Sequence, residues 1–338
     1  MCKDVLFLGA GFSAAVAGIP TMADLTKKVK TKILNDFKES IVDHYKNEIP
    51  DQLKDDVEAM LSYLSADLPW KSKVQQYENL ALYEKIVEKI VDVISSETSK
   101  NNVCYKSGYV YDFFSKFMEN KENSIISLNY DVLCENFIQE IDGYDTDFSR
   151  LYGAPITYVG SRIHGGGFLR YPSSEISLIK LHGSINWKWC GLSDNDQIYF
   201  SGKELLGNVW DEGQSSAGLR TCIVPPVMDK SLFYGNVTLR TLWEIAAQKI
   251  SSADRIFIIG FSFPQTDYPV RFLFQSALRQ CNAKIYVINN ASGKTLNELK
   301  TNYDIVFGDK YNFINGVENK NQENDPFKTF CYNYPKDF

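Results

Sequence analysis

Short runs of apolar residues alternate along this chain with longer segments in which apolar residues recur at helical spacing. Continuous runs rich in β-formers are typical of buried parallel strands, and they lie at 5–8, 124–128, 176–181, 255–259 and 284–288. Spacing of three or four positions predicts amphipathic helices at 25–37, 132–141, 237–250 and 270–279. Strands that alternate with helices predict an α/β fold with a mostly parallel sheet.

Residues 40–120 interrupt this alternation with helical spacing alone. The apolar positions from Leu53 to Leu64 fall on one helical face, as do those from Leu82 to Ile94, and no strand pattern separates them. We therefore expect a helical layer, inserted at about 40–120, that covers a cleft of the sheet. The chain is otherwise expected to form a single domain over 1–338.

Segments rich in glycine, serine and other polar residues separate some of these elements. We expect irregular excursions at about 142–176 and 191–220, the second forming a loop or a hairpin, and a flexible turn at 319–325. Short extended pieces are predicted at 222–226 and at 304–307, the second as a final strand.

The first strand leads into a glycine-containing segment, Gly9-Ala10-Gly11-Phe12-Ser13, followed by small residues that can begin a helix. This arrangement suits a phosphate cradle at a helix start, because glycine permits the tight turn and the close approach of a diphosphate. A plain glycine turn between a core strand and a core helix is the alternative. A short secretory signal peptide is a second alternative, but Asp4 and the glycines argue against it.

Small or polar residues also follow the carboxyl ends of the other predicted strands. In open α/β sheets ligands bind outside those ends, so convergence of several such sets predicts a binding site. The sets are Asn129 with Asp131, His182 with Gly183 and Ser184, Gly260 with Ser262, and Asn289 with Asn290.

Composition excludes several classes of protein. The 338 residues are 44% hydrophobic and 23% charged, as in ordinary globular proteins, and the net charge of −6 argues against binding to duplex nucleic acid. The 7 cysteines are scattered without a C-x-x-C pair, which argues against a disulfide framework and a zinc site and fits a reducing cytoplasm. No apolar run approaches the roughly 20 residues that span a bilayer. We expect a cytoplasmic protein without a metal.

Three polar residues at strand ends are the candidates for chemistry. Only His182 among the 3 histidines follows a buried-type strand, and its titration near neutral pH suits proton transfer. Asn129 offers a donor and an acceptor that can orient water or a hydroxyl, and Asp131 either faces the same cleft or caps the next helix. A dehydrogenase would show an acidic residue about 20 positions after the glycines, where this chain has a helical pattern.

Taken in order, the segments GAGFS…GIP, SLNYD, KLHGS, GFS…D and NN resemble the sirtuin superfamily. The similarity is greater to the sirtuin-like NAD hydrolases of bacterial antiphage defence than to the protein deacylases. It implies a Rossmann-like sheet that binds NAD, with residues 9–13 at the diphosphate and ribose, and Gly260, Ser262 and Asn289 at the adenosine half. It also implies that Asn129 and His182 form the catalytic pair, with Asp131 near the nicotinamide.

Two departures separate the chain from the deacylases. The Gly-Ile-Pro turn continues with Thr21-Met22-Ala23 where deacylases have Asp-Phe-Arg, and the paired cysteines of their zinc module are missing. The resemblance therefore implies hydrolysis of NAD to nicotinamide and ADP-ribose. Because such an activity has to be controlled, we expect a homo-oligomer, which can be built on a HerA-type ATPase ring or another defence sensor. An NAD-dependent deacylase and a non-catalytic nucleotide-sensing module remain alternatives.

Overall fold

The computed structural model describes most of the chain. The described residues are 2–100, 103–142, 151–152, 156–158, 176–189, 198–200, 220–291, 293–315 and 325–335.

The centre of the molecule is a six-stranded sheet in which every described pairing is parallel. Its strands stand in the order β10-β9-β8-β1-β2-β4. Along the chain they are β1 (Asp4–Leu8), β2 (Ser124–Ser127), β4 (Ser177–Lys180), β8 (Arg255–Ile259), β9 (Lys284–Asn289) and β10 (Tyr311–Asn315). β1 lies between β2, the second of these strands along the chain, and β8, the fourth of them. This is the arrangement of doubly wound, Rossmann-like sheets. The predicted fold class is confirmed.

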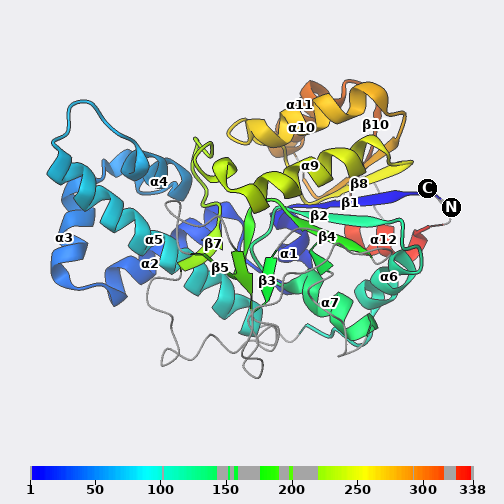
Figure 1. Ribbon diagram of the computed structural model, residues 1–338, viewed down its shortest axis with the longest axis horizontal. Coiled ribbons are helices and arrows are strands. Elements are labelled where there is room, and N and C mark those ends of the chain that lie inside the picture. Colours follow the sequence, from blue (N-terminus) through cyan, green and yellow to red (C-terminus); the bar gives the residue numbers. More distant parts are fainter. Residues whose placement is uncertain are drawn as a thin grey trace.

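Helices cover both faces of this sheet, as Figure 1 shows. One face carries α9 (Val237–Ser251), α10 (Tyr268–Ala277) and α11 (Gly293–Phe307). The other carries α1 (Ala10–Ala17), α6 (Tyr109–Met118), α7 (Leu133–Asp142) and α12 (Pro326–Asn333). All five residues of β1 are buried, which explains why its sequence is continuously apolar after Asp4.

The predicted helical insertion is present between β1 and β2. It contains α2 (Met22–Asp36), α3 (Glu39–Glu48), α4 (Val57–Ser65) and α5 (Lys73–Lys100), with a short 3-10 turn at Asp51–Leu53. These helices form the blue and cyan lobe in Figure 1, at the end of the sheet toward which β1 runs. The apolar faces predicted from the sequence are buried, including Met60 and Leu64 of α4 and Ile86 and Ile90 of α5.

A second sheet of four strands lies beside the first. Its order is β3-β6-β5-β7, and the strands are β3 (Ile156–Tyr158), β6 (Ile198–Phe200), β5 (Gly183–Trp189) and β7 (Arg220–Ile223). The sequence pattern did not predict this sheet. Most of the two expected irregular excursions lies outside the described residues. Within them, β3 is a short strand that was not predicted, whereas β6 pairs antiparallel with β5, in line with the hairpin alternative for 191–220.

The predicted strand at 304–307 is wrong, because these residues form the last turn of α11. Three buried residues, Leu299, Tyr303 and Val306, recur at helical spacing, whereas Ile305 is half exposed. The apolar residues at the end of α11 therefore belong to the buried face of a helix, except Ile305, and do not form a strand. The edge strand is β10, further along the chain, and its residues are mostly half-buried. No helix in the described part of the chain is long and apolar enough to cross a membrane.

Candidate functional site

The loops that follow β1 and β8 touch at the centre of the sheet, where the direction of strand order reverses. The Gly9 N–H donates to the Ile259 carbonyl at 3.0 Å, and the Gly11 N–H donates to the Gly260 carbonyl at 2.8 Å. Gly260 has a φ of +66°, and a Cβ there would lie 2.3 Å from the Phe12 nitrogen. Only glycine permits this contact, which forms the floor of a crevice of the kind that binds ligands in doubly wound sheets.

A pocket with a volume of about 220 Å³ opens at this point. Its lining includes residues that follow four neighbouring strands: Ala10 and Ser13 after β1, Asn129 and Asp131 after β2, His182 after β4, and Gly260 and Ser262 after β8. The helical layer closes another wall with Leu25 of α2, Glu58 of α4 and Ile94 of α5. Residues predicted from separate strand ends are therefore brought together, under a helical cover.

The predicted site residues Gly9, Gly11, Phe12, Gly183, Ser184 and Asn289 are not among the residues that line this pocket. Phe12 packs in the core, with its ring centroid 5.5 Å from that of Phe327. The Ser184 hydroxyl donates to the Tyr130 carbonyl at 3.3 Å, and the Asn289 amide donates to the Tyr303 hydroxyl at 2.9 Å. Their proposed contacts with a nucleotide stay predictions.

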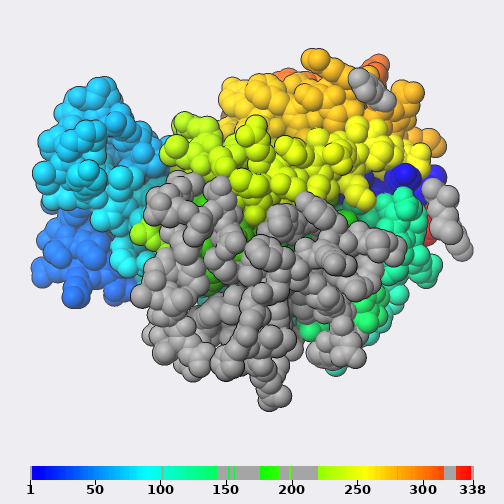
Figure 2. Space-filling view, viewed as in Figure 1, coloured from blue at the N-terminus to red at the C-terminus, as the bar shows by residue number. Residues whose placement is uncertain are grey.

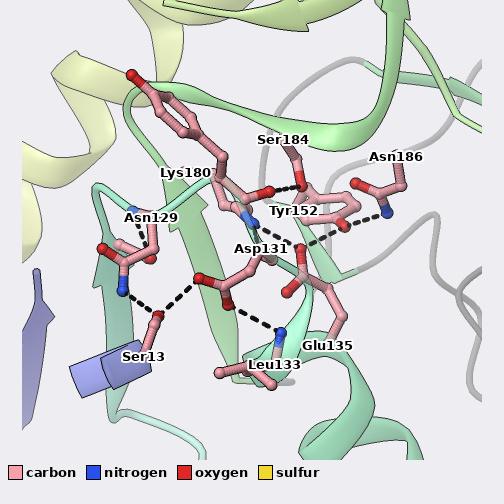
Figure 3. A network of polar contacts seen from close by, with 11 residues as sticks. Ser13, Asn129, Asp131, Leu133, Glu135, Tyr152, Lys180, Ser184 and Asn186 are labelled. Atoms are coloured by element: carbon pink, nitrogen blue, oxygen red, sulfur yellow. Dashed lines mark hydrogen bonds and ion pairs between the residues drawn. The ribbon is translucent and has the colours of Figure 1, made fainter. Parts of the chain in front are cut away.

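Ser13, Asn129 and Asp131 form one buried polar network. The Asn129 amide nitrogen donates to the Ser13 hydroxyl at 2.8 Å and to the Gly9 carbonyl at 2.9 Å. The Ser13 hydroxyl in turn donates to Asp131 Oδ2 at 2.6 Å (Figure 3). Because the amide nitrogen is held on one side, the side chain of Asn129 is fixed in orientation beside the pocket.

Asp131 both faces the pocket and caps the next helix, the two roles that the sequence left open. It lines the pocket, and its Oδ1 accepts the Leu133 N–H at 3.1 Å at the start of α7. Each carboxylate oxygen therefore already accepts one bond from the protein. In a dinucleotide-binding dehydrogenase the acidic residue after the second strand binds the ribose diol. In this chain that carboxylate is engaged with Ser13 and with the helix start instead.

A buried ion pair contacts this network at Asp131. Lys180 Nζ lies 3.0 Å from Glu135 Oε1 and also donates to the Asp131 carbonyl. The Tyr152 hydroxyl donates to the same Glu135 oxygen at 2.9 Å (Figure 3). The side chains of Lys180 and Glu135 are 1% and 0% exposed. Each therefore compensates the charge of the other, which would otherwise be costly to bury. The pair fixes the backbone at Asp131.

His182 lies at the point where the two sheets meet. The chain turns directly from β4 into β5 there, and the Val224 N–H donates to the His182 carbonyl at 2.8 Å. The turn requires Gly183, whose φ is +76° and whose Cβ would lie 2.2 Å from the Cys222 carbonyl oxygen. Gly183 therefore has a demonstrated structural reason to be glycine, independent of any ligand.

The surroundings of His182 favour a neutral imidazole. Burial lowers its pKa from 6.5 to about 4, the nearby Asp267 carboxylate opposes this effect, and Lys230 adds to it. Near pH 7 the ring is then unprotonated and able to accept a proton.

Three further charged residues, to which the sequence analysis assigned no role, complete the pocket wall. Lys230 Nζ donates to Asp267 Oδ1 at 2.8 Å, and both residues line the pocket. Glu58 Oε2 accepts the Thr266 hydroxyl at 3.2 Å, and burial raises the pKa of that carboxyl. Asp267 follows the GFS segment and was visible as part of that motif. Lys230 and Glu58 lie in a loop and on a helix, away from any strand end, and so carried no signal.

Among the described residues, no group of histidine, cysteine, aspartate and glutamate side chains has a geometry that could hold a metal ion.

Comparison with known proteins gives structural similarity without detectable sequence similarity. No family model matches the chain, and no curated protein matches it. Among solved structures, one described as "Sir2-p53 peptide-NAD+" has 14% identity and a TM-score of 0.43, with 98% of this chain and 90% of that chain covered. One described as "Structural Basis for the Mechanism and Regulation of Sir2 Enzymes" has 14% identity and a TM-score of 0.41, with coverages of 90% and 91%. One described as "Sir2 bound to acetylated peptide" has 13% identity and a TM-score of 0.40, with coverages of 98% and 90%. The chain is thus similar in structure, at low identity, to Sir2 proteins.

Proposed function

We propose that this chain is an NAD hydrolase, which cleaves the bond between nicotinamide and ribose and releases nicotinamide and ADP-ribose. The observation that carries the proposal is the meeting of Asn129 and His182 in one pocket at the switch point of a doubly wound sheet. Such switch points are where dinucleotides bind in this class of sheet. The ordered motifs that resemble the sirtuin-like NAD hydrolases support the same assignment.

The pocket offers what this cleavage requires. Nicotinamide leaves as a neutral base from a pyridinium, so the leaving group needs little acid catalysis, and the transition state resembles an oxocarbenium ion. An attacking water needs a group that orients it and a group that accepts its proton. Asn129 is held in one orientation by Ser13 and Gly9, and His182 is neutral near pH 7 because burial lowers its pKa to about 4.

The size and polarity of the pocket are compatible with an aromatic ring. Its volume of about 220 Å³ exceeds the roughly 150 Å³ of an engineered cavity that accepts benzene. Leu25, Ile94 and Phe261 supply apolar wall, so the reacting bond would be screened from bulk water. We assign Ala10 and Ser13 to the ribose and diphosphate side, and Gly260, Ser262 and Asn289 to the adenosine half.

The first test follows nicotinamide release from NAD by the purified chain. His182→Ala and Asn129→Ala are each expected to reduce the rate by about 10²–10⁴-fold or more, the usual contribution of acid–base and orienting groups. His44→Ala and Asn282→Ala are matched controls, because neither residue lines the pocket, and they should retain the parent rate. If His182→Ala turned over NAD like the parent, the proposed role of His182 would be wrong.

A second test separates hydrolysis from acyl transfer. In a deacylase, loss of NAD requires an acylated peptide and gives an acylated sugar nucleotide. The chain has Ala23 where the deacylase pattern has arginine, so we expect ADP-ribose at the same rate with or without acetylated peptide. Mass spectrometry of the products distinguishes the outcomes, and a strict requirement for peptide would favour the deacylase alternative.

We further propose a setting for this activity. Unregulated hydrolysis of NAD would harm the cell that makes the enzyme, so we expect control through a homo-oligomer, a HerA-type ATPase or another sensor, in antiphage defence. The helical layer of α2 to α5 is the candidate regulatory element, because it forms a wall of the pocket. Sedimentation that shows a monomer with full activity and no partner would contradict this part of the proposal.

A further inference from the structure

Two charged side chains lie buried next to His182, and no strand-end pattern predicted them. Lys230 and Asp267 are each only 6% exposed, and Lys230 Nζ lies 2.8 Å from Asp267 Oδ1. The same Asp267 oxygen is 4.0 Å from His182 Nε2. One carboxylate oxygen is therefore shared, at unequal distances, between a lysine and a histidine.

His182 Nε2 is a buried nitrogen with no hydrogen-bond partner among the described residues. Leaving such a group unpaired costs about 1–3 kcal/mol. Asp267 Oδ1 is the carboxylate oxygen that faces it, about 1 Å beyond hydrogen-bonding distance. Hydrogen bonds of this kind are often long in a ligand-free site and shorten when the substrate is bound.

We propose that Asp267 and Lys230 are positioning residues for His182: Asp267 accepts the Nε2 proton of the ring, and Lys230 holds the carboxylate in place. An accepted Nε2–H fixes the tautomer, so that Nδ1 is the nitrogen left to take a proton. Once Nδ1 is protonated, the ring carries a positive charge that the Asp267 carboxylate stabilises. This inference rests on the proposed function, because it assigns His182 as the base of that reaction.

Lys230 offsets the effect of the Asp267 charge on the pKa of His182. Without it, a lone buried carboxylate would attract a proton onto His182 even in the resting enzyme, and a protonated imidazole cannot act as a base. Lys230 also counteracts the negative charge of Glu58 on α4. Glu58 accepts a hydrogen bond from Thr266, the residue that precedes Asp267. The other ring close to His182 is that of the uncharged Trp243, with centroids 6.3 Å apart. Among the described residues, Asp267 and Lys230 are thus the charged groups that act on His182.

The sign of each substitution follows from these charges. Lys230→Met removes a positive charge, so the pKa of His182 should rise. Asp267→Asn removes a negative charge, so the pKa should fall further below about 4. A charge at 4–6 Å commonly changes a pKa by about one pH unit or more.

The experiment measures the titration of His182 by NMR of the imidazole resonances, with His182→Ala used to assign the signal. Lys230→Met is expected to move the midpoint upward by about one pH unit or more, whereas Asp267→Asn should leave the ring unprotonated to the lowest pH at which the chain is folded. Lys28→Met is the matched control, because Lys28 forms an ion pair with Glu97 at 2.8 Å in the helical layer. If Asp267→Asn does not fold, the charge-neutral double variant with Lys230→Met replaces it, and its midpoint should fall below that of Lys230→Met. An unchanged midpoint in Lys230→Met would overturn the proposal.

Nicotinamide release, measured against pH, separates this inference from the proposed function. In Lys230→Met the acid limb of the profile should move to higher pH together with the NMR midpoint, whereas a merely structural role would lower the rate at every pH. If the parent released no nicotinamide, the proposed function would fail while the titration still tested the pair. If the parent were active and neither the midpoint nor the acid limb moved, the positioning role would fail alone.

Discussion

At the residue scale, His182 couples the chemistry of the pocket to the stability of the protein. Burial holds its pKa at about 4 in the folded chain, against an ordinary value of 6.5. Between these values the unfolded chain binds more protons than the folded one, so stability falls as the pH decreases from 6.5 toward 4. Above pH 6.5 this contribution is complete and no longer changes.

We therefore predict that His182→Gln loses part of this pH dependence. The parent should lose up to about 3 kcal/mol of unfolding free energy between pH 6.5 and 4 because of His182 alone. Glutamine does not titrate, so the difference between parent and variant should be largest at pH 7 and shrink toward pH 4. Urea unfolding at a series of pH values measures it, with His44→Gln as the control. Parallel pH curves for parent and His182→Gln would contradict the prediction.

Some residues of the pocket could be predicted from the sequence and others could not. Asn129, Asp131 and His182 could be predicted to lie in one pocket because each comes within a few residues of the end of a strand, and parallel strands bring their carboxyl ends to one edge. Lys230 approaches the same pocket from a loop after β7, and Glu58 from α4 of the insertion. Their positions depend on how distant segments pack, and a local pattern contains no information about that.

At the element scale, the contact between the β1 and β8 loops depends on a single backbone conformation. Gly260 has a φ of +66° and would place a Cβ 2.3 Å from the Phe12 nitrogen, whereas Gly308 has a φ of +62° with nothing within 4 Å. The two glycines therefore separate the cost of the conformation from the cost of the contact.

We predict unequal effects of alanine at these two positions. Gly308→Ala should lower the free energy of unfolding by about 1 kcal/mol, the cost of a left-handed conformation for a residue with a Cβ. Gly260→Ala should lower it by about 3 kcal/mol or more, because the backbone at the start of α1 has to move as well. Chemical denaturation measures both. Equal losses would show that the loops can separate without cost.

Elements were predictable where their burial pattern was simple. The strands β1, β2, β4, β8 and β9 each contain consecutive apolar residues, because both faces of the sheet are covered. The edge strand β10 has mostly half-buried residues and lacks such a run, whereas the end of α11 contains one and therefore resembles a strand in the sequence. β5 follows β4 after only two residues, so no separate turn segment marks the boundary between the two strands in the sequence.

At the scale of the whole molecule, the pocket lies between two layers that the chain builds separately. Ala10 and His182 come from the sheet side, whereas Leu25, Glu58 and Ile94 come from the inserted helices. The lobe of α2 to α5 stands at one end of the molecule in the space-filling view (Figure 2). Two links also join the layers across loops: the Thr266 hydroxyl donates to Glu58, and the Met228 N–H donates to the Ser62 hydroxyl.

A ligand that bridges these layers should stabilise the whole chain. We predict that NAD raises the thermal midpoint of the His182→Ala variant, which we expect to bind NAD without turnover. A ligand at one hundred times its dissociation constant adds about 2.7 kcal/mol to the unfolding free energy. ADP-ribose should stabilise nearly as well, and nicotinamide alone much less, because in the proposed binding mode it fills only part of the pocket. Binding without any turnover by the parent would favour the nucleotide-sensing alternative over the hydrolase. An unchanged midpoint at millimolar NAD, in a folded variant, would mean that this pocket is not the NAD site, since binding to the native state alone must raise the temperature at which the native state is lost.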